Sequence, residues 1–333
     1  MKQVAQLAGV GTKTVSRVVN GEPNVSVGTA ERVWEAVRTL DYHVDLRAGS
    51  LRRPGGATRT IALLVASVEN PFAGEIHRGV EEVAREHDVA VLASSLDEEP
   101  EREVAAVEDS IRRHVDGIIV NTTTADGSAL ERVAHLDVPI VFVDRAPQGR
   151  AVDCVTSDTR VAAERATAHL LAHGHSRVVL LTERLNVATA VERRQGFLDA
   201  FRTAGLDDDG ALVISDLVGA AAAEQALLTA MSSHRPPTAV FSGQNLLTEG
   251  AIHALSRLGL RRTIAHVGFD DLPLADVLDP ALTVVRQDPR TMGRLAAQRL
   301  FSRLAGSTDG PEHLVLPTEL ICRGSGEISC STT

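Results

Sequence analysis

Short apolar segments alternate with amphipathic helical patterns over most of this chain, and that alternation restricts its fold more than any other feature. The first run of alternating apolar and helical segments occupies 61–67, 72–87, 89–94, 101–114, 117–121, 128–135 and 139–143. Further apolar segments follow at 177–181, 212–215, 239–242 and 264–269. Continuous apolar strands between amphipathic helices are typical of parallel sheets covered on both faces. The pattern therefore predicts an α/β fold with two doubly wound parallel-sheet lobes and a ligand cleft between them.

The length and composition are those of a well-packed protein with more than one domain. The chain has 333 residues, of which 44% are hydrophobic and 23% charged, so we expect about two domains and little disorder. Its longest apolar runs are too short to span a bilayer, and its first residues lack the apolar stretch of a signal peptide. The three cysteines, Cys154, Cys322 and Cys330, lack metal-type spacing. We therefore expect a cytoplasmic protein without a membrane segment.

The sequence lacks the motifs of several enzyme classes. No lysine follows Lys13, which excludes a Schiff-base lysine or a GxxxxGK phosphate loop from the rest of the chain. No GxSxG, HExxH or CxxC motif is present. His173 and His175 flank Gly174 in a pattern typical of a helix end, and the acidic run at 207–209 is typical of a turn. We therefore expect no catalytic residue, no metal ligand and no cofactor.

Charge is distributed unevenly along the chain. Residues 1–60 hold nine basic and five acidic side chains and are therefore +4, whereas the whole chain is -10, which leaves -14 for the remainder. A positively charged N-terminal segment on an otherwise negatively charged protein is expected when that segment binds nucleic acid. A solvated helical surface can carry the same charge. The case for DNA binding must therefore rest on motifs.

Residues 1–43 have the pattern of a helix-turn-helix followed by a third helix. A helical pattern at 2–8 ends at Gly9, which tolerates the left-handed backbone of a tight helix exit. The second helix begins near Thr12 and has apolar positions at helical spacing. A third helix begins at Ser26 or Thr29, and its inward face is expected to hold Val33, Trp34 and Val37. A short helix with a polar, cationic N-terminal half fits the major groove of DNA.

The strings VAQLAGV at 4–10 and TVSRVVN at 14–20 closely resemble the DNA-binding signature of the lactose-repressor (LacI/GalR) family of bacterial transcription regulators. The resemblance implies that Thr12, Lys13 and Arg17 read bases. It implies that Thr14, Ser16 and Asn20 contact phosphate or hold the turn.

The string DLRAGSLRR at 45–53 resembles the hinge helix of the same family, within an expected hinge and linker at 44–59. The resemblance implies that two such helices lie in the minor groove of operator DNA. Leu51 occupies the position of the leucine that wedges into a base step, and Ala48 that of the small residue between the helices. Val44 and Asp45 depart from the usual Pro-Asn, and Gly49 weakens a helix by up to ~1 kcal/mol. A plain linker is the alternative interpretation.

The resemblance extends through an expected effector-binding and dimerisation domain at 60–333 and implies the fold of periplasmic sugar-binding proteins. It implies three crossings between lobes, near 157, 286 and 312. The expected N-lobe then comprises about 60–157 and 287–312, and the expected C-lobe about 158–286 and 313–328.

Several motifs of the effector region match those of the family, among them NPF at 70–72, VDR at 143–145, RRQGF at 193–197, GFDD at 268–271 and VRQ at 285–287. Gln244-Asn245 replaces the usual Asn-Asp, and Leu217 stands where many members have an aromatic residue. The residues that the resemblance places at the ligand are Phe72, Asp144, Asp158, Arg193, Asn245, Asp270 and Gln287. Asn70 and Asp158 can alternatively serve only as helix N-caps.

These observations predict a ligand-responsive transcription factor, most simply a repressor. A homodimer would place two recognition helices on the half-sites of a palindromic operator, and a small polar, sugar-like effector would bind between the lobes. Dimer contacts are expected from the helical face at 73–84 and from 277–282. Two alternatives are a transport receptor and an enzyme of the same two-lobed fold, which would act through Asp144 and Asp270.

Overall fold

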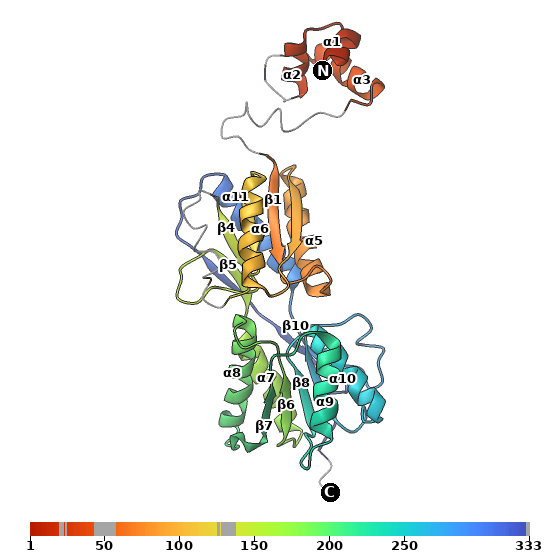
Figure 1. Cartoon of the computed structure of the whole chain (residues 1–333), viewed down its shortest axis with the longest axis vertical. Coiled ribbons are helices and arrows are strands. Elements are labelled where there is room, and N and C mark those ends of the chain that lie inside the picture. Colours follow the sequence, from red (N-terminus) through yellow and green to blue (C-terminus); the bar gives the residue numbers. More distant parts are fainter. Residues whose placement is uncertain (20–22, 24, 43–57, 125–126, 128–137, 331–333) are drawn as a thin grey trace. The chain divides into compact units, whose positions relative to one another are not determined.

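The computed structural model of the chain describes residues 1–19, 23, 25–42, 58–124, 127 and 138–330 (Figure 1). It divides into two compact units, Met1–Thr58 and Arg59–Thr333. Among the described residues, no helix is both long and apolar enough to cross a membrane. The helix expected at 128–135 lies outside the described residues, as do residues 44–57 of the hinge and linker expected at 44–59.

The first unit is a cluster of three short helices, α1 (Lys2–Ala8), α2 (Thr12–Val19) and α3 (Val27–Thr39). Gly9 ends α1 with a left-handed backbone (φ 64°), as its sequence position predicts. Val4, Val15 and Val33 are fully buried at the centre of the cluster. These three valines come from three different helices, so the small core depends on all of them.

Trp34 does not lie in that core. Its side chain is 40% exposed, whereas the neighbouring Val33 is fully buried and Val37 packs against the core. The expectation that Trp34 faces inward was therefore wrong. The inward face of α3 is formed by Val33, Ala36 and Val37, and Trp34 lies to one side of it.

The second unit begins with a six-stranded, fully parallel sheet, which forms the first lobe. Its strands are β1 (Thr60–Val65), β2 (Ala90–Ser95), β3 (Gly117–Val120), β4 (Ile140–Val143), β5 (Cys154–Ser157) and β11 (His313–Leu316). They lie in the order β11-β5-β4-β3-β1-β2. Helices α5 (Pro71–Glu86) and α11 (Pro289–Leu304) pack on one face, and α6 (Pro100–Arg112) packs on the other. The alternation of the sequence therefore builds a sheet covered on both faces.

The second lobe repeats this plan with another six-stranded sheet. Its strands are β6 (Val178–Leu181), β7 (Ala211–Ile214), β8 (Ala239–Ser242), β9 (Ala265–Phe269), β10 (Thr283–Arg286) and β12 (Glu319–Ile321), in the order β12-β10-β9-β8-β6-β7. Helices α7 (Thr159–Ala172) and α8 (Ala188–Thr203) cover one face, and α9 (Gly219–Met231) and α10 (Asn245–Leu258) cover the other. A short 3-10 helix, η2 (Asp208–Gly210), precedes β7. Only β12 runs antiparallel to its neighbour.

Glycines allow close helix crossings in both lobes. A Cβ atom at Gly79 of α5 would lie 2.0 Å from the carbonyl oxygen of Arg290, at the crossing with α11. A Cβ atom at Gly196 of α8 would lie 2.1 Å from the carbonyl oxygen of Arg160, at the crossing with α7. Because glycine lacks a side chain, these backbones approach each other directly.

The chain passes between the lobes after β5, after β10 and between β11 and β12. The expected third crossing near 312 was wrong, because β11 (His313–Leu316) pairs with β5 in the first lobe. Alternate residues of β11 are exposed, so this edge strand lacks the continuous apolar run by which the central strands were predicted.

Candidate ligand cleft and DNA-binding helix

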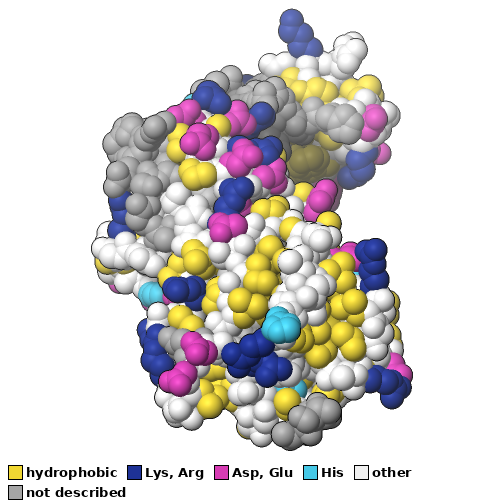
Figure 2. Space-filling model, turned by 60° about the horizontal axis from the view of Figure 1, so that its bottom comes forward, with side chains coloured by type: hydrophobic (Ala, Val, Ile, Leu, Met, Phe, Trp, Pro, Cys, Tyr) yellow, Lys and Arg dark blue, Asp and Glu magenta, His cyan; other side chains and the backbone are white. Residues whose placement is uncertain are grey.

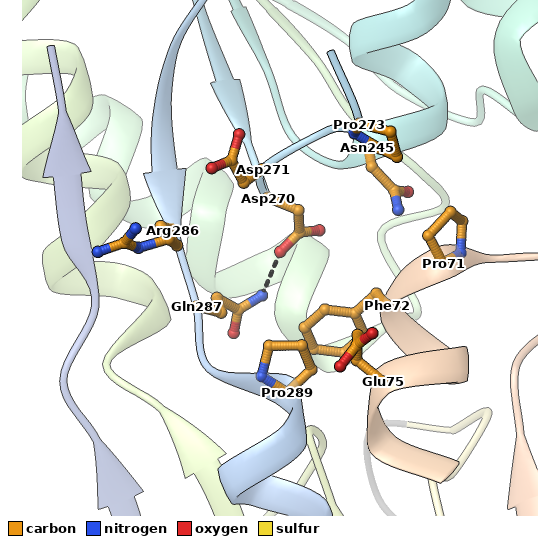
Figure 3. Close-up of a pocket in the computed structure, with 10 residues that line it drawn as sticks. All are labelled: Pro71, Phe72, Glu75, Asn245, Asp270, Asp271, Pro273, Arg286, Gln287 and Pro289. Carbon is orange, nitrogen blue, oxygen red and sulfur yellow. Dashed lines mark hydrogen bonds between the residues drawn. The ribbon is translucent and has the colours of Figure 1, made fainter. Parts of the chain in front are cut away.

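The second unit contains two adjoining cavities where residues that follow the strands of both sheets meet. The carboxyl ends of parallel strands are where ligands of open α/β sheets bind. Phe72, Asp270 and Gln287 line both cavities. Asp144 and Arg193 line one of them, and Asn245 lines the other, which is shown in Figure 3. Six of the seven residues predicted at the ligand therefore border one continuous cleft.

Each lobe places one buried aspartate in this cleft directly after a strand. Asp144 follows β4 and Asp270 follows β9, and both have left-handed backbones, with φ of 66° and 70°. Non-glycine residues rarely adopt this conformation, although aspartate tolerates it better than most. Asn121 Nδ2 donates to Asp144 Oδ2 at 3.0 Å, and Gln287 Nε2 donates to Asp270 Oδ1 at 2.6 Å (Figure 3).

Burial changes the proton affinity of both aspartates. Desolvation raises the pKa of Asp144, although Arg145 and Arg193 oppose the shift. Desolvation likewise raises the pKa of Asp270 to about 6, although Arg193 and the hydrogen bond from Gln287 oppose it. Burial destabilises the ionised form of each carboxylate. A hydrogen bond from a ligand hydroxyl group would stabilise that ionised form, so both aspartates are suited to accept such a bond.

Arg145 is held firmly within the first lobe. It is 6% exposed, and its two terminal nitrogens donate to the two carboxylate oxygens of Glu98 at 2.7 and 2.8 Å. A third hydrogen bond joins it to the carbonyl of Thr122 at 3.2 Å. Burial lowers the pKa of Arg145, but the Glu98 carboxylate outweighs burial and the net shift is upward. Bidentate pairing of this kind fixes the orientation of the guanidinium plane.

Arg193 is held more loosely within the second lobe. It is 4% exposed and lies over the ring of Phe269, with its Cζ 4.4 Å from the ring centroid. Its polar contacts to Glu183 are long, at 3.4 and 3.5 Å. Arg193 therefore has a stacking partner and a nearby counter-charge, but it lacks the short paired bonds of Arg145.

Three buried polar atoms of the cleft have no hydrogen-bond partner among the described residues. They are the Nε atoms of Arg145 and Arg193 and the Oδ1 atom of Asn121. Most buried polar groups in folded proteins are hydrogen-bonded, so each such atom requires an explanation. Two donors and one acceptor beside two carboxylates suit a small ligand with several hydroxyl groups.

One hydrogen bond crosses the cleft directly. Asn245 Nδ2, at the start of α10, donates to Asn70 Oδ1 at 2.6 Å, and Asn70 precedes α5. The same Asn70 oxygen accepts from the backbone N–H of Phe72 at 3.0 Å, which confirms that Asn70 caps its helix, with Pro71 at the first position. Ser157 Oγ donates to Gln287 Oε1 at 2.5 Å, which links two of the crossing segments.

Asp158 does not line either cavity. Its Oδ1 atom accepts from the backbone N–H of Thr318 at 2.9 Å, in the segment between β11 and β12. Arg165 of α7 donates to the carbonyl oxygen of the same threonine, also at 2.9 Å. Asp158 is the residue before α7, but its side chain makes no capping hydrogen bond to that helix. The structure therefore places Asp158 at a crossing between the lobes and not with the other predicted ligand residues.

The N-terminal unit presents part of α2 to solvent. Thr12 and Lys13 are exposed, Thr14 and Arg17 are half-buried, and Ser16 is 8% exposed. Arg17 Nη2 donates to the carbonyl oxygen of Pro23 at 3.1 Å, so this guanidinium is already engaged in the turn after α2. The three remaining residues predicted at DNA, Asn20, Ala48 and Leu51, lie outside the described residues.

Comparison with known families agrees with both units. Residues 1–45 match the model of bacterial regulatory proteins of the lacI family. Residues 58–323 match the model of periplasmic binding proteins and the sugar-binding domain of the LacI family. The chain belongs to the LacI family of bacterial regulatory proteins. This LacI-family regulator is thus a DNA-binding transcription factor with a ligand-binding domain of the periplasmic-binding-protein type.

The relatives of this LacI-family regulator match it over nearly its whole length. The ribose operon repressor of Escherichia coli (strain K12) is 31% identical over 98% of this chain and 99% of the relative. The repressor PurR of Aliivibrio fischeri (strain ATCC 700601 / ES114) is 28% identical over 98% and 97%. A lac repressor dimer bound to operator and an anti-inducer superposes with a TM-score of 0.85, at 25% identity and 97% coverage of both chains. A complex of the regulator CelR with cellobiose gives 0.71, at 30% identity and 97% and 98% coverage.

Several cleft residues of this LacI-family regulator were missed by the sequence interpretation. Asn121 and Glu183 both come shortly after buried strands, so their position at a strand end was a usable signal. Glu98 precedes α6 and has no such signal, because only the fold brings it to Arg145. Gln244, noted only as a departure from the usual sequence, also borders the cleft.

Proposed function

We propose that this regulator is a repressor that binds a palindromic operator as a homodimer and that a small, sugar-like effector between the lobes controls its operator affinity. The proposal rests on the meeting of the buried carboxylates of Asp144 and Asp270 with buried arginines and several amide side chains from both lobes in one cleft. The printed names of relatives include repressors, and one neighbouring structure holds cellobiose. A polyol has the hydroxyl groups to satisfy donors and acceptors at once.

Each predicted cleft residue has a distinct proposed role. Asp144 and Asp270 accept hydrogen bonds from effector hydroxyls, and Arg193 donates to effector oxygens. Asn245 and Gln287 bond on their amide edges, and Phe72 packs against the apolar face of the ligand. Asp158 acts on the crossing segment and not on the ligand, since its carboxylate bonds to Thr318.

The proposed DNA contacts follow the resemblance to the family. Thr12, Lys13 and Arg17 read base edges in the major groove, and Thr14 and Asn20 contact phosphate. Ser16 holds the turn, which agrees with its burial. Leu51 wedges into the minor groove, and Ala48 allows the two hinge helices to approach.

The effector acts by favouring one arrangement of the lobes over the other. Such a shift requires different effector affinities in the two arrangements, because a ligand that binds both equally changes nothing. Asn245 and Asn70 form a direct bond across the cleft, and an effector that inserts between them alters the contact between the lobes.

The proposed homodimer uses surfaces of the second unit. Leu274 and Val277 are 69% and 68% exposed, which suits a contact with a second copy. Figure 2 shows patches of hydrophobic side chains among charged ones on the visible face. Ala73 and Ala84 of α5 are buried within their own lobe, so only the outer face of that helix remains for a partner.

We further propose that the protein acts in the cytoplasm and turns over no substrate. A test incubates it with effector candidates and finds only reversible binding.

The proposal is tested by selecting bound duplexes from a random DNA pool and measuring affinity with and without sugars, sugar phosphates and nucleosides. Ligands are first screened by thermal shift, because a ligand that binds only the folded state raises the melting temperature. We expect a palindromic consensus, a salt-dependent preference over random DNA, and a change of operator affinity with one ligand class. A protein with no preferred sequence under any of these conditions contradicts the proposal.

Arg17→Ala should weaken operator binding by ~1–3 kcal/mol and leave effector affinity unchanged, because arginine reads a guanine edge with two hydrogen bonds. Fluorescence anisotropy with operator and scrambled duplexes measures the loss. Arg38→Ala is the matched control, because it removes one exposed positive charge from α3. An equal loss in both variants would reduce the role of Arg17 to electrostatic attraction.

Leu51→Ala should weaken the operator complex more than the complex with random DNA, because an apolar wedge requires the kinked duplex of the specific complex. Leu40→Ala removes a comparable leucine from the end of α3 and serves as the control. A uniform loss on both DNAs contradicts the wedge.

A further inference from the structure

A second cluster of reactive side chains lies in the second lobe, apart from the cleft. His169 belongs to α7, Cys322 follows β12 directly, and Glu327 lies in the segment after it. One ligating atom from each of these three residues lies within 4.8 Å of the other two. None of the three lines either cavity of the cleft. The proposed regulatory function does not use them.

The three side chains form a donor set suited to zinc. Imidazole nitrogen, thiolate sulfur and carboxylate oxygen are the ligands that Zn²⁺ takes in proteins, at about 2.0–2.3 Å from the metal. Donors around a single tetrahedral zinc are therefore roughly 3–4 Å apart. The present separations of up to 4.8 Å need only small side-chain rotations to reach that range. Hard cations such as Mg²⁺ prefer oxygen ligands only, so the thiol favours a softer metal.

The carboxylate of Glu327 is already oriented for such a role. Its Oε2 atom accepts from Thr283 Oγ1 at 2.8 Å and from the backbone N–H of Gly324 at 2.5 Å. Its other oxygen, Oε1, lies 2.6 Å from His169 Nε2. Neighbouring groups that fix one oxygen of a carboxylate and leave the other for the metal are typical of metal sites.

The surroundings add to the chemistry of the cluster. The thiol of Cys322 contacts the carboxylate of Glu327, and Cys322 is accessible to solvent. The ring of His173, one turn further along α7, lies 4.6 Å from the ring of His169. His173 Nδ1 bonds to the carbonyl oxygen of His169, which holds that second ring beside the cluster. His175 is not part of the group, since its nitrogens bond to Thr238 and to the carbonyl oxygen of Ile328.

We propose that His169 Nε2, Cys322 Sγ and Glu327 Oε1 bind one Zn²⁺ ion, which ties α7 to the C-terminal segment of the second lobe. The thiol of Cys322 loses its proton to solvent as the Zn–S bond forms. The proton that His169 Nε2 shares with Glu327 Oε1 is likewise released to solvent, and the neutral ring keeps its proton on Nδ1, so that the Nε2 lone pair binds the metal. A water molecule completes the four positions. A bare hydrogen bond between His169 and Glu327 is the competing explanation, and it gives Cys322 no role.

The consequence for the protein is mechanical. Helix α7 follows the first crossing between the lobes, and β12 follows the third. A metal ion bound by α7 and by the segment after β12 would hold together the two parts of the second lobe that follow the first and third crossings. Zinc should therefore raise the melting temperature of the whole chain, because a ligand that binds only the folded state stabilises it.

The test uses the untagged, reduced, full-length protein after removal of metal by a chelator. Co²⁺ is added as a spectroscopic probe, since a cobalt–thiolate bond gives a near-ultraviolet charge-transfer band. We expect one Co²⁺ per chain, a thiolate band, and displacement of cobalt by one equivalent of Zn²⁺. Cys322→Ser should abolish the band, and His169→Asn should weaken zinc affinity by at least about 100-fold. Thr283→Val removes the hydrogen bond to Glu327 Oε2 together with the two that Thr283 Oγ1 accepts from the backbone N–H groups of Arg323 and Gly326, and it should weaken zinc affinity by about tenfold.

Two matched controls separate this site from weak surface binding. Cys330→Ser removes a nearby cysteine that is not in the group, and His253→Asn removes another histidine that faces a glutamate, Glu224. Both should retain the band and the zinc affinity. No thiolate band in the wild-type protein overturns the proposal, and so does a band that persists in Cys322→Ser. Far-ultraviolet circular dichroism of each metal-free variant establishes that it is folded. Operator binding is measured separately, so failure of the zinc site leaves the regulatory proposal untouched.

Discussion

The two lobes of the second unit share one strand order but stabilise their cleft charges in different ways. Each places an aspartate with a left-handed backbone after its fourth strand, Asp144 in the first lobe and Asp270 in the second. The next residue is Arg145 in the first lobe, where it binds Glu98 with two short bonds. The next residue in the second lobe is Asp271, which binds Arg323 of the C-terminal segment.

The cation of the second lobe therefore comes from elsewhere. Arg193 reaches the cleft from α8 and lies 3.4 Å from Glu183, without a bidentate bond. Arg145 in the first lobe is thus held by two short bonds to one carboxylate, whereas Arg193 in the second lobe is held only by long contacts and by stacking on Phe269. We infer that the first lobe supplies a fixed wall of the cleft and the second lobe the adjustable one.

The largest expected effects separate the two arginines. Arg145→Ala should lower the free energy of unfolding by ~3 kcal/mol, because it leaves Glu98 without its bidentate partner and removes the nearby positive charge from buried Asp144. Arg193→Ala should lower it by only ~1 kcal/mol, because its ion pair is long, and yet should weaken effector binding about 100-fold. Urea unfolding and isothermal titration calorimetry measure the two quantities. Equal losses of stability in the two variants would contradict the inference that Arg145 is held more firmly than Arg193.

A second prediction concerns the helix crossings, where the two lobes should behave alike. Gly79→Ala and Gly196→Ala should each cost ~1–3 kcal/mol of stability, since the added methyl group would meet a backbone oxygen at 2.0 and 2.1 Å. Gly74→Ala in α5 is the control, because no atom lies within 4 Å of its added Cβ and alanine favours helices by up to ~1 kcal/mol. Thermal or urea unfolding shows whether one lobe tolerates the change that the other does not.

The smallest expected effect is a pH dependence of effector affinity that arises from Asp270 in the second lobe. Burial raises the pKa of Asp270 to about 6, so this carboxylate is ionised at neutral pH and becomes protonated as the pH falls through 6. An effector hydroxyl donates to the ionised form, and its affinity should fall about tenfold from pH 7 to pH 5. Because the folded-state pKa lies above the unfolded value, the same group makes the free protein less stable as the pH rises from about 4 to 6.

Calorimetry at several pH values measures this dependence, with Asp270→Asn as the control. The variant should bind more weakly at pH 7 and should lose the part of the pH dependence that belongs to Asp270. An unchanged pH profile in Asp270→Asn would assign the titration to another group, such as Asp144, whose pKa burial also raises.

The sequence predicted eight of the strands by their apolar runs, but not the short interior strands β5 and β10, and most of the cleft residues were predicted through the family resemblance. Buried parallel strands are continuous apolar runs, and side chains that follow such strands meet at one edge of the sheet. Asp144, Asp270 and Arg193 were assigned to the cleft through the resemblance of the VDR, GFDD and RRQGF motifs to those of the family. Glu98 was missed because its role depends on a long-range pairing with Arg145 that no local pattern encodes.

The errors lie where tertiary contacts override local pattern. Trp34 was expected on the inward face of α3, but Val33, Ala36 and Val37 form that face and Trp34 is exposed. Strand β11 was missed because it lies at the edge of its sheet, with alternate residues exposed. Asp158 was assigned to the ligand because the resemblance places it there, and only the fold shows its bond to Thr318.

The hydrogen bonds of Asp158 and Arg165 to the backbone of Thr318 bear on how the response to effector can change by mutation. Asp158 accepts a hydrogen bond from the backbone N–H of Thr318, and Arg165 of α7 donates to its carbonyl oxygen, so the backbone of Thr318 is bound on both sides by residues at and near the start of α7. Removing either hydrogen bond to Thr318 would change the separation of the two lobes in the absence of effector. The side chains that recognise the effector would stay unchanged. Mutations far from both ligand and operator could thus produce regulators that are always on or always off.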